Sequence, residues 1–549
     1  MADLAPGGGC ADNFGYVEVP TLGGLLIRAG ERYGEREALT VDGDHLSFAG
    51  LHRRAVSIAR GLSALGVGRG TRVGLFMPNC LAFVEYMFAI TLLGAVAVPI
   101  NSRFRSRELA HVITDAELGL IVTTDVAADI AHHPLRLAEV LDGQPGGVRP
   151  IAVSAGRNDL DGFIAEQELL DLGDRVPTQT VADASARVRL RDTAAILYTS
   201  GTTAMPKGCV HTHEGLVRNG LAAGRTRLQL TTSDRFWDPL PMFHVGFLAP
   251  MIACLDAGAA LLAMSHFDPE SALDLIEHEH ATWLYPAFQA IVQPLLDASS
   301  FTTRRLPQVR MVMCVGLPPL LRQIQAAFPQ AALLSTYGST ETGGVITYHK
   351  PDATRDQRAT TCGTPFRGVE IAIKDIASDQ HLPAGQQGEI LVRGFSVLEG
   401  YLNDPQATAT ALDREGWLHT GDLGLIDEDG HVGYRGRLKE MIKVGGENVS
   451  CSEVEALLAE HPAVAVVHVV PAPDPRLEQV VAAFVELRPG ATANAEELIG
   501  FCRGQIAGFK VPRYVRFVDE WPMSATKVRK AALATRIADD IAASQANAG

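Results

Sequence analysis

Short apolar runs alternate with helical patterns along roughly the first two thirds of the chain. Five of these runs end in small or turn-forming residues: RVGLFM (72–77), GLIVTT (119–124), AAILYTS (194–200), ALLAM (260–264) and VRMVMCVG (309–316). Between them, apolar positions recur every three or four residues, as in SFAGLHRRAVSIARGLSALGV. Strands that alternate with helices predict an α/β fold with a mostly parallel sheet, covered on both faces.

The pattern changes twice toward the C-terminus. After about residue 360, alternating and turn-rich segments (VEIAIKD, GEILVRG and GLIDEDGHVGYRGR) predict a small antiparallel β-subdomain. After Arg437, GENVSCSEVEALLAEHPAVAVVHVVPAPD predicts a helix and then a strand, QVVAAFVEL a strand and AEELIGFCRGQI a helix. We therefore predict a large α/β domain with a β-subdomain over residues 1–437 and a small α+β domain over residues 438–549.

Composition narrows the class of protein. The chain has 549 residues, 47% hydrophobic and 20% charged, which is enough to bury a large core. Its net charge of −15 argues against a broad nucleic-acid footprint or binding to an anionic membrane surface, but it allows a local basic phosphate pocket. Eight single cysteines without a CxxC pair indicate neither a disulfide framework nor a zinc site.

The longest apolar stretches, residues 86–100 and 247–264, are too short or too interrupted to span a bilayer. They are better interpreted as buried helices or helix–strand pairs. The first residues, MADLAPGGGCADNF, lack the basic and apolar regions of a signal peptide. We therefore expect a compact soluble protein in the cytoplasm.

The segment YTSGTTAMPKG (198–208) contains the clearest chemical signal. A predicted strand is followed by small and hydroxyl-bearing residues and then by a lysine. Backbone N–H groups, hydroxyls and the charge of the lysine can together surround a polyphosphate. The residues are Thr199, Ser200, Gly201, Thr202, Thr203 and Lys207. The spacing differs from GxxxxGK[ST], since five residues separate Gly201 from Lys207. Taken alone, the segment also fits a Ser/Thr-rich surface loop.

This segment resembles the phosphate loop of the adenylate-forming superfamily, which includes acyl-CoA synthetases, firefly luciferases and the adenylation domains of peptide synthetases. Six further blocks resemble that superfamily in its order: PMFH (241–244), STYGSTE (335–341), GYLNDP (400–405), GWLHTGD (416–422), YRGRLKE (434–440) and PMSATKV (522–528). Ala204 departs from the superfamily, which has a glycine at that point of the phosphate loop.

The resemblance implies a nucleotide site. Tyr337 would lie against adenine, with Gly338 beside it, while Thr340 would contact the α-phosphate and Glu341 would bind Mg²⁺. Asp422 would hold the ribose hydroxyls, and Arg437 would reach the same sugar. Two structural alternatives stay open. Asp422 fits a turn or cap in TGDLG, and Glu341 fits an acid at a helix N-terminus.

The resemblance also implies a mobile C-terminal domain. Lys527 would bridge the carboxylate and the α-phosphate, although a missing glycine before it leaves Lys530 as an alternative. A hinge maps to Lys439. Lys443, Gly445 and Gly446 would line the pantetheine tunnel of CoA, where a missing Cβ permits close approach. As a structural alternative, the segment 439–449 fits an ordinary β-turn.

The sequence says less about which carboxylic acid is the substrate. His244 stands where peptide-synthetase domains have an aspartate for the substrate ammonium, so amino acids are disfavoured. The resemblance makes His244 a gate, with a core histidine as the alternative reading. An apolar acyl pocket is expected from Val245, Phe247, Leu248, Ala287 and Gly316.

The sequence thus predicts an ATP-dependent acyl-CoA ligase that activates a fatty or aryl acid as an acyl-adenylate and transfers it to CoA. ATP, Mg²⁺ and CoA are the implied cofactors and co-substrates, and Lys527, Thr340, Glu341 and His244 are the expected catalytic residues. Two alternatives stay open: a ligase that loads the phosphopantetheine of a carrier protein, and a nucleotide-binding protein that has lost turnover. Nothing in the sequence indicates the oligomeric state.

Overall fold

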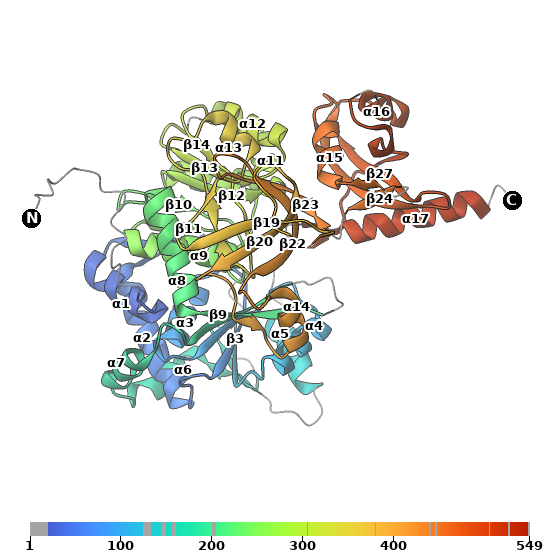
Figure 1. The fold of residues 1–549 in the computed structure, drawn as a ribbon. Coiled ribbons are helices and arrows are strands. Elements are labelled where there is room, and N and C mark those ends of the chain that lie inside the picture. The colour runs from blue at the N-terminus through green and yellow to red at the C-terminus, as the bar shows by residue number, and fades with distance from the viewer. Residues whose placement is uncertain are drawn as a thin grey trace, which may run out of the picture.

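The structure is a computed structural model. It describes residues 20–124, 133–143, 150–155, 161–199, 205–304, 306–378, 380–438, 441–444, 447–503, 505–524 and 527–546. Figure 1 shows a large N-terminal part of several layers and a smaller C-terminal part beside it.

Two mostly parallel sheets form the large part, where the sequence predicted one. The first has the order β21-β9-β8-β4-β3-β5-β6-β7. Its strands are β3 (Arg72–Phe76), β4 (Val96–Pro99), β5 (Leu120–Thr123), β6 (Ile151–Ser154), β7 (Ile164–Ala165), β8 (Thr193–Thr199), β9 (Lys207–Thr212) and β21 (Gly400–Tyr401). Only the pairs β8–β9 and β9–β21 are antiparallel.

The second sheet has the order β14-β13-β12-β10-β11-β1-β2 and is parallel except for β2. Its strands are β1 (Glu37–Val41), β2 (Asp44–Ser47), β10 (Arg235–Trp237), β11 (Ala260–Ala263), β12 (Trp283–Phe288), β13 (Met311–Val315) and β14 (Ala332–Leu334). β1 pairs with β11 across more than two hundred residues of chain. Hydrophobic periodicity predicts strands but not their distant partners, so the sequence did not separate the two sheets.

Helices cover these sheets. They are α1 (Leu22–Tyr33), α2 (Phe48–Ala64), α3 (Leu81–Leu92), α4 (Ser106–Asp115), α5 (His133–Asp142), α6 (Glu166–Asp174), α7 (Thr178–Arg187), α8 (His213–Ala223), α9 (Val245–Ala257), α10 (Pro269–His278), α11 (Gln289–Asp297), α12 (Pro318–Ala327), α13 (Arg355–Thr360) and α14 (Pro405–Ala411). The predicted helix after Ser47 is α2. It begins at an N-cap in which Gly50 N donates to Ser47 Oγ at 2.9 Å, and it buries Phe48, Leu51 and Ile58.

The two long apolar stretches are helix–strand pairs, as predicted. Residues 86–100 span the end of α3 and β4, and residues 247–264 span α9 and β11. Both helices are buried on nearly all sides, which explains why their sequences show no polar stripe. Within the described ranges, every helix is too short or too polar to cross a bilayer.

The β-subdomain is confirmed as an antiparallel sheet with the order β19-β20-β22-β23. Its strands are β19 (Val369–Lys374), β20 (Gly388–Gly394), β22 (Leu418–Ile426) and β23 (Val432–Arg437). Two short ladders precede it, β15 (Gly338–Ser339) with β16 (Gly344–Val345) and β17 (Thr347–Tyr348) with β18 (Thr364–Pro365).

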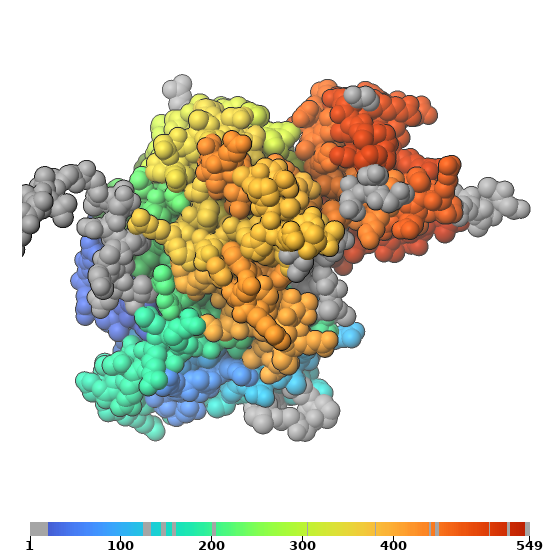
Figure 2. Space-filling view, viewed as in Figure 1, coloured from blue at the N-terminus to red at the C-terminus, as the bar shows by residue number. Residues whose placement is uncertain are grey.

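The C-terminal part has its own sheet, in the order β25-β24-β27-β26 with β28 beside β27, and it is mixed with helices as predicted. Its elements are β24 (Ile442–Val444), β25 (Glu447–Val449), α15 (Cys451–Ala459), β26 (Val464–Asp474), β27 (Glu478–Leu487), α16 (Ala495–Cys502), β28 (Tyr514–Phe517), β29 (Met523–Ser524), β30 (Lys527–Val528) and α17 (Lys530–Ala546). Two apolar clusters made of its own residues form its core. Figure 2 shows it projecting from the large part.

Candidate active site

The predicted phosphate loop joins β8 to β9. Thr199 and Lys207 are cross-strand partners at the open end of this hairpin. Lys207 Nζ lies 3.1 Å from Asp404 Oδ2 and 5.5 Å from the centre of the Tyr401 ring. Ser200, Gly201, Thr202 and Thr203 lie outside the described residues. The lysine therefore stands at the mouth of the loop, bound to a carboxylate from another segment.

Asp422 is the centre of a buried polar cluster. It lies within β22, is 3% exposed, and pairs across the strands with Arg437. Tyr337 Oη donates to Asp422 Oδ2 at 2.7 Å, and Arg437 Nε lies 2.8 Å from Asp422 Oδ1. Burial and the charge of Asp422 raise the pKa of Tyr337 well above its ordinary value. Asp422 is thus neither a turn residue nor a helix cap, and the turn interpretation is wrong.

Gly338 begins β15, and Thr340 and Glu341 belong to the turn between β15 and β16. A Cβ on Gly338 would lie 2.2 Å from Gly344 O, so this close approach excludes any side chain. No helix begins after Ser339, and the interpretation of Glu341 as a helix N-terminal acid is wrong. Tyr401 Oη donates to Glu341 Oε1 at 3.2 Å. Tyr401 therefore contacts both the lysine of the phosphate hairpin and the predicted metal ligand.

His211 is a residue that sequence reasoning missed. It lies on β9, four residues after Lys207, and is 1% exposed. Burial lowers its pKa to about 4, so the imidazole is neutral at pH 7, and it bonds the backbone of Thr340. The signal available in the sequence was the pair of histidines in His211-Thr212-His213, shortly after the phosphate loop. His211 therefore supports the turn that carries Thr340 and Glu341.

The predicted acyl residues lie on α9 and at the carboxyl ends of β12 and β13. His244 is the N-cap of α9 and is only half-buried, with its ring 4.5 Å from that of Phe243, so it is not a core histidine. Val245 begins α9, and Phe247 and Leu248 are buried in the main core. Ala287 lies near the end of β12 with φ of 58°, and Gly316 is exposed just after β13.

The two candidate lysines of the C-terminal part differ in their surroundings. Lys527 begins β30, and its backbone pairs with Ser524 in a short hairpin. Lys530 Nζ lies 2.8 Å from Glu455 Oε1, a buried carboxylate that also accepts a hydrogen bond from Val469 N at 2.7 Å. Lys443 lies on the exposed side of β24. Lys439, Gly445 and Gly446 are outside the described residues.

Comparisons with known proteins decide the family. The model of the AMP-binding enzymes matches residues 26–402, and the model of their C-terminal domain matches residues 453–527. The chain belongs to the AMP-binding enzymes. It is an adenylate-forming enzyme of the acyl-CoA ligase type, an acid–thiol ligase.

Three relatives of this AMP-binding enzyme are a CoA ligase matched by sequence and two solved structures. A Rhodococcus jostii CoA ligase, named for a propanoyl group with a methyl-dioxo-octahydro-indenyl ring, is 34% identical and covers 93% of this chain and 97% of its own. ATP-bound MatB from Rhodopseudomonas palustris has a TM-score of 0.82 at 29% identity, covering 94% and 99%. The anthranilate CoA ligase AuaEII, in complex with anthranoyl-AMP, has a TM-score of 0.86 at 25% identity, covering 96% and 99%.

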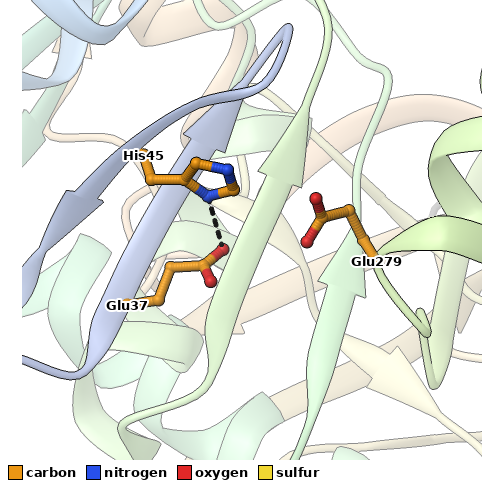
Figure 3. Close-up of side chains that lie close together, drawn as sticks. All are labelled: Glu37, His45 and Glu279. Atoms are coloured by element: carbon orange, nitrogen blue, oxygen red, sulfur yellow. Dashed lines mark ion pairs between the residues drawn. The ribbon is translucent and has the colours of Figure 1, made fainter.

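A second cluster of this AMP-binding enzyme offers possible metal ligands far from these residues in sequence. Glu37, His45 and Glu279 place ligand atoms within 4.8 Å of one another, from β1, β2 and the end of α10 (Figure 3). Arg235 pairs with Glu37 at 2.8 Å and also with Glu279. Because this guanidinium already bonds both carboxylates, we interpret the cluster as a structural ion-pair network.

The Lys530–Glu455 pair predicts a pH dependence of stability. Although burial opposes ionisation of Glu455, Lys530 and His468 lower its pKa from 4.5 to about 2. Because the pKa of Glu455 is lower in the folded state than in the unfolded state, its ionisation stabilises the fold at pH values above about 4.5. This stability, about 3 kcal/mol at most, is lost as the pH falls from about 4.5 to 2.

Thermal unfolding of the full chain, measured from pH 7 down to acid, should show a lower midpoint for Glu455→Gln than for wild type at pH 7 and a weaker dependence of the midpoint on acid. Glu453→Gln, on the same helix but in an exposed pair, is the control; equal effects of both variants would contradict the assignment.

Proposed function

We propose that this enzyme joins a carboxylic acid to CoA in two steps, with an acyl-adenylate between them. The observation that carries the proposal is the cluster of Tyr337, Asp422 and Arg437, a buried carboxylate bonded to a tyrosine and an arginine. Such a carboxylate suits the two hydroxyls of a ribose. The phosphate hairpin and Glu341 supply the remaining parts of an ATP site.

In the first step the acid's carboxylate attacks the α-phosphorus of ATP and pyrophosphate leaves. Thr340, Lys207 and the loop 199–207 would surround the phosphates, and Lys527 would neutralise charge on the attacked group. The partly exposed carboxylate of Glu341, a hard oxygen donor beside the hairpin, fits Mg²⁺, which would neutralise phosphate charge. Phosphate oxygens would compete with Asp404 for the ammonium of Lys207.

In the second step the thiolate of CoA attacks the acyl carbon and AMP leaves. We propose that the domain boundary lies after Arg437, because β23 ends there and β24 of the C-terminal sheet begins at Ile442. Rotation about Lys439 would remove Lys527 and bring Lys443, Gly445 and Gly446 to the pantetheine. A cytoplasmic location remains a prediction.

The acid is proposed to enter at the carboxyl edge of the second sheet. His244 at the start of α9 would gate the pocket, and Val245, Phe247, Leu248, Ala287 and Gly316 would shape it. The relatives act on a bicyclic keto acid and an aromatic acid, which supports a fatty or aryl acid with a bulky apolar body.

Carboxylate-dependent exchange of pyrophosphate into ATP tests the first step. We expect exchange with acids graded by size and aromaticity, and thioester formation when free CoA is added. Exchange without a thioester would indicate that the acceptor is a carrier protein. No exchange with any acid would contradict the proposed function.

His244→Ala should change acid selection and leave ATP binding intact, because we assign His244, the N-cap of α9, to the acyl pocket and not to the nucleotide site. We expect the ratio of kcat/KM between a slender and a bulky acid to shift by roughly tenfold. His278→Ala, an exposed histidine on α10, is the control. A His244→Ala enzyme with weaker ATP binding and unchanged acid preference would remove His244 from the acyl pocket.

A further inference from the structure

Asp238 is a carboxyl group with an unsatisfied oxygen in the interior. It follows β10 directly and is 0% exposed. Its Oδ1 accepts a hydrogen bond from Leu240 N at 2.9 Å, while Oδ2 has no hydrogen-bond partner among the described residues. Leaving a buried polar atom unpaired costs free energy, and such an atom in a native protein calls for an explanation.

The surroundings of Asp238 favour its neutral form. Burial raises its pKa well above the ordinary value, and among the described residues only the Leu240 hydrogen bond opposes this shift. The ionisable groups with which it interacts electrostatically are Cys254, Tyr285 and Tyr348, all of them buried and uncharged. Within the described part of the chain, no cation pairs with Asp238. In its neutral form Asp238 would have a hydroxyl available as a donor, and Oδ2 is the oxygen without a partner in the described residues.

Tyr285 and Tyr348 extend this polar spot. Their hydroxyls are hydrogen-bonded to each other, and both rings are almost fully buried. Phe236, two residues before Asp238 on the same strand face, packs 5.6 Å from the Tyr285 ring and 5.7 Å from Trp283. The carboxyl group of Asp238 and the two tyrosine hydroxyls therefore lie in a region of packed aromatic side chains.

The elements that carry these groups are those of the acyl pocket. Asp238 lies six residues before His244 and interacts with Cys254, which is near the C-terminal end of α9, the helix that Val245 begins. Tyr285 lies two residues before Ala287 on β12, and Tyr348 follows β16, which contacts α9. The carboxyl ends of parallel strands are where α/β sheets bind ligands. From these positions we infer that Asp238 and the two tyrosines lie at the inner end of the region that the acid would enter.

We propose that Asp238, with Tyr285 and Tyr348, forms a polar end wall of the acyl pocket, and that the preferred acid carries a neutral oxygen, as a ketone or hydroxyl, at the end remote from its carboxylate. This inference rests on the proposed function. The Asp238 hydroxyl would donate to that oxygen and lose its unsatisfied state. A second carboxylate would be disfavoured there, because no cation in the described residues is placed to neutralise it.

Matched pairs of acids test the proposal. Pyrophosphate exchange is measured with straight-chain alkanoic acids and with methyl-ketone acids of the same chain length. We expect wild type to prefer the keto acid at the best length by at least ~10-fold in kcat/KM, since a polar site rejects analogues that leave it unpaired. Asp238→Leu should lose or reverse this preference, whereas Asp238→Asn retains a donor and should keep most of it.

Controls separate this proposal from folding and from the proposed function. Thermal unfolding and KM for ATP should match wild type in Asp238→Asn. Trp237 precedes Asp238 in the chain and Trp283 stacks on Phe236, so we use their fluorescence as a readout of acid binding without turnover. If exchange is absent with every acid, the proposed function fails, and the fluorescence titration still decides this inference. It is overturned if Asp238→Leu and wild type discriminate the paired acids equally, or if wild type prefers a matched acid with a terminal ammonium.

Discussion

Lys527→Ala should stop acyl-adenylate formation and leave thioester formation nearly intact. If Lys527 neutralises charge only during attack on the α-phosphate, its loss should slow the first half-reaction by at least ~10²-fold, roughly 3 kcal/mol. The second half-reaction, from a synthetic acyl-adenylate and CoA, contains no such attack. Single-turnover measurements of the two half-reactions test this expectation separately.

Lys530 is the internal comparison for this experiment. Its ammonium is 2.8 Å from the buried carboxylate of Glu455, so it is held within the C-terminal part. Lys530→Ala should lower the unfolding midpoint, because it leaves a buried charge without its partner. Lys530→Arg, which keeps the charge, should recover most of the stability. If Lys530→Ala blocks adenylation at unchanged stability while Lys527→Ala does not, the assignment of the two lysines is reversed. If Lys527→Ala impairs both half-reactions equally, the domain rotation is wrong.

Asp422→Ala should raise KM for ATP strongly. The proposed ribose contact is a pair of charge-assisted hydrogen bonds, and losing even one, worth about 1.5–3 kcal/mol, corresponds to a rise of roughly 10- to 150-fold. Initial rates against ATP concentration, at saturating acid and CoA, measure this change directly.

Tyr337→Phe is the matched control for Asp422. It removes the hydroxyl that donates to Asp422 Oδ2 but keeps the ring proposed to lie against adenine. We expect a smaller rise in KM than for Asp422→Ala, because the carboxylate remains beside Arg437. A folded Asp422→Ala enzyme with unchanged ATP affinity and turnover would place the ribose elsewhere.

Much of the local structure could be predicted because it depends on near neighbours in the chain. The runs RVGLFM, GLIVTT and ALLAM became β3, β5 and β11, and the helical pattern after Ser47 became α2. The ordered blocks named the residues of the proposed nucleotide site, and the fold joins Tyr337, Asp422 and Arg437 although 100 positions separate the first from the last. Roles that need ATP, CoA or domain rotation remain predictions.

The sequence by itself determined the strand and helix segments, the β-subdomain, the C-terminal unit and the family blocks. Each of these depends on the hydrophobic periodicity of one segment or on a short ordered motif. The tertiary structure decided what depends on distant contacts. It divided the strands between two sheets and showed that no helix begins at Glu341. It also paired Lys530 with Glu455 and buried His211 against the backbone of Thr340. It also enclosed Asp238 without a cation among the described residues. Burial and electrostatic partners come from segments far apart in the chain, and local patterns carry no record of which segments will meet.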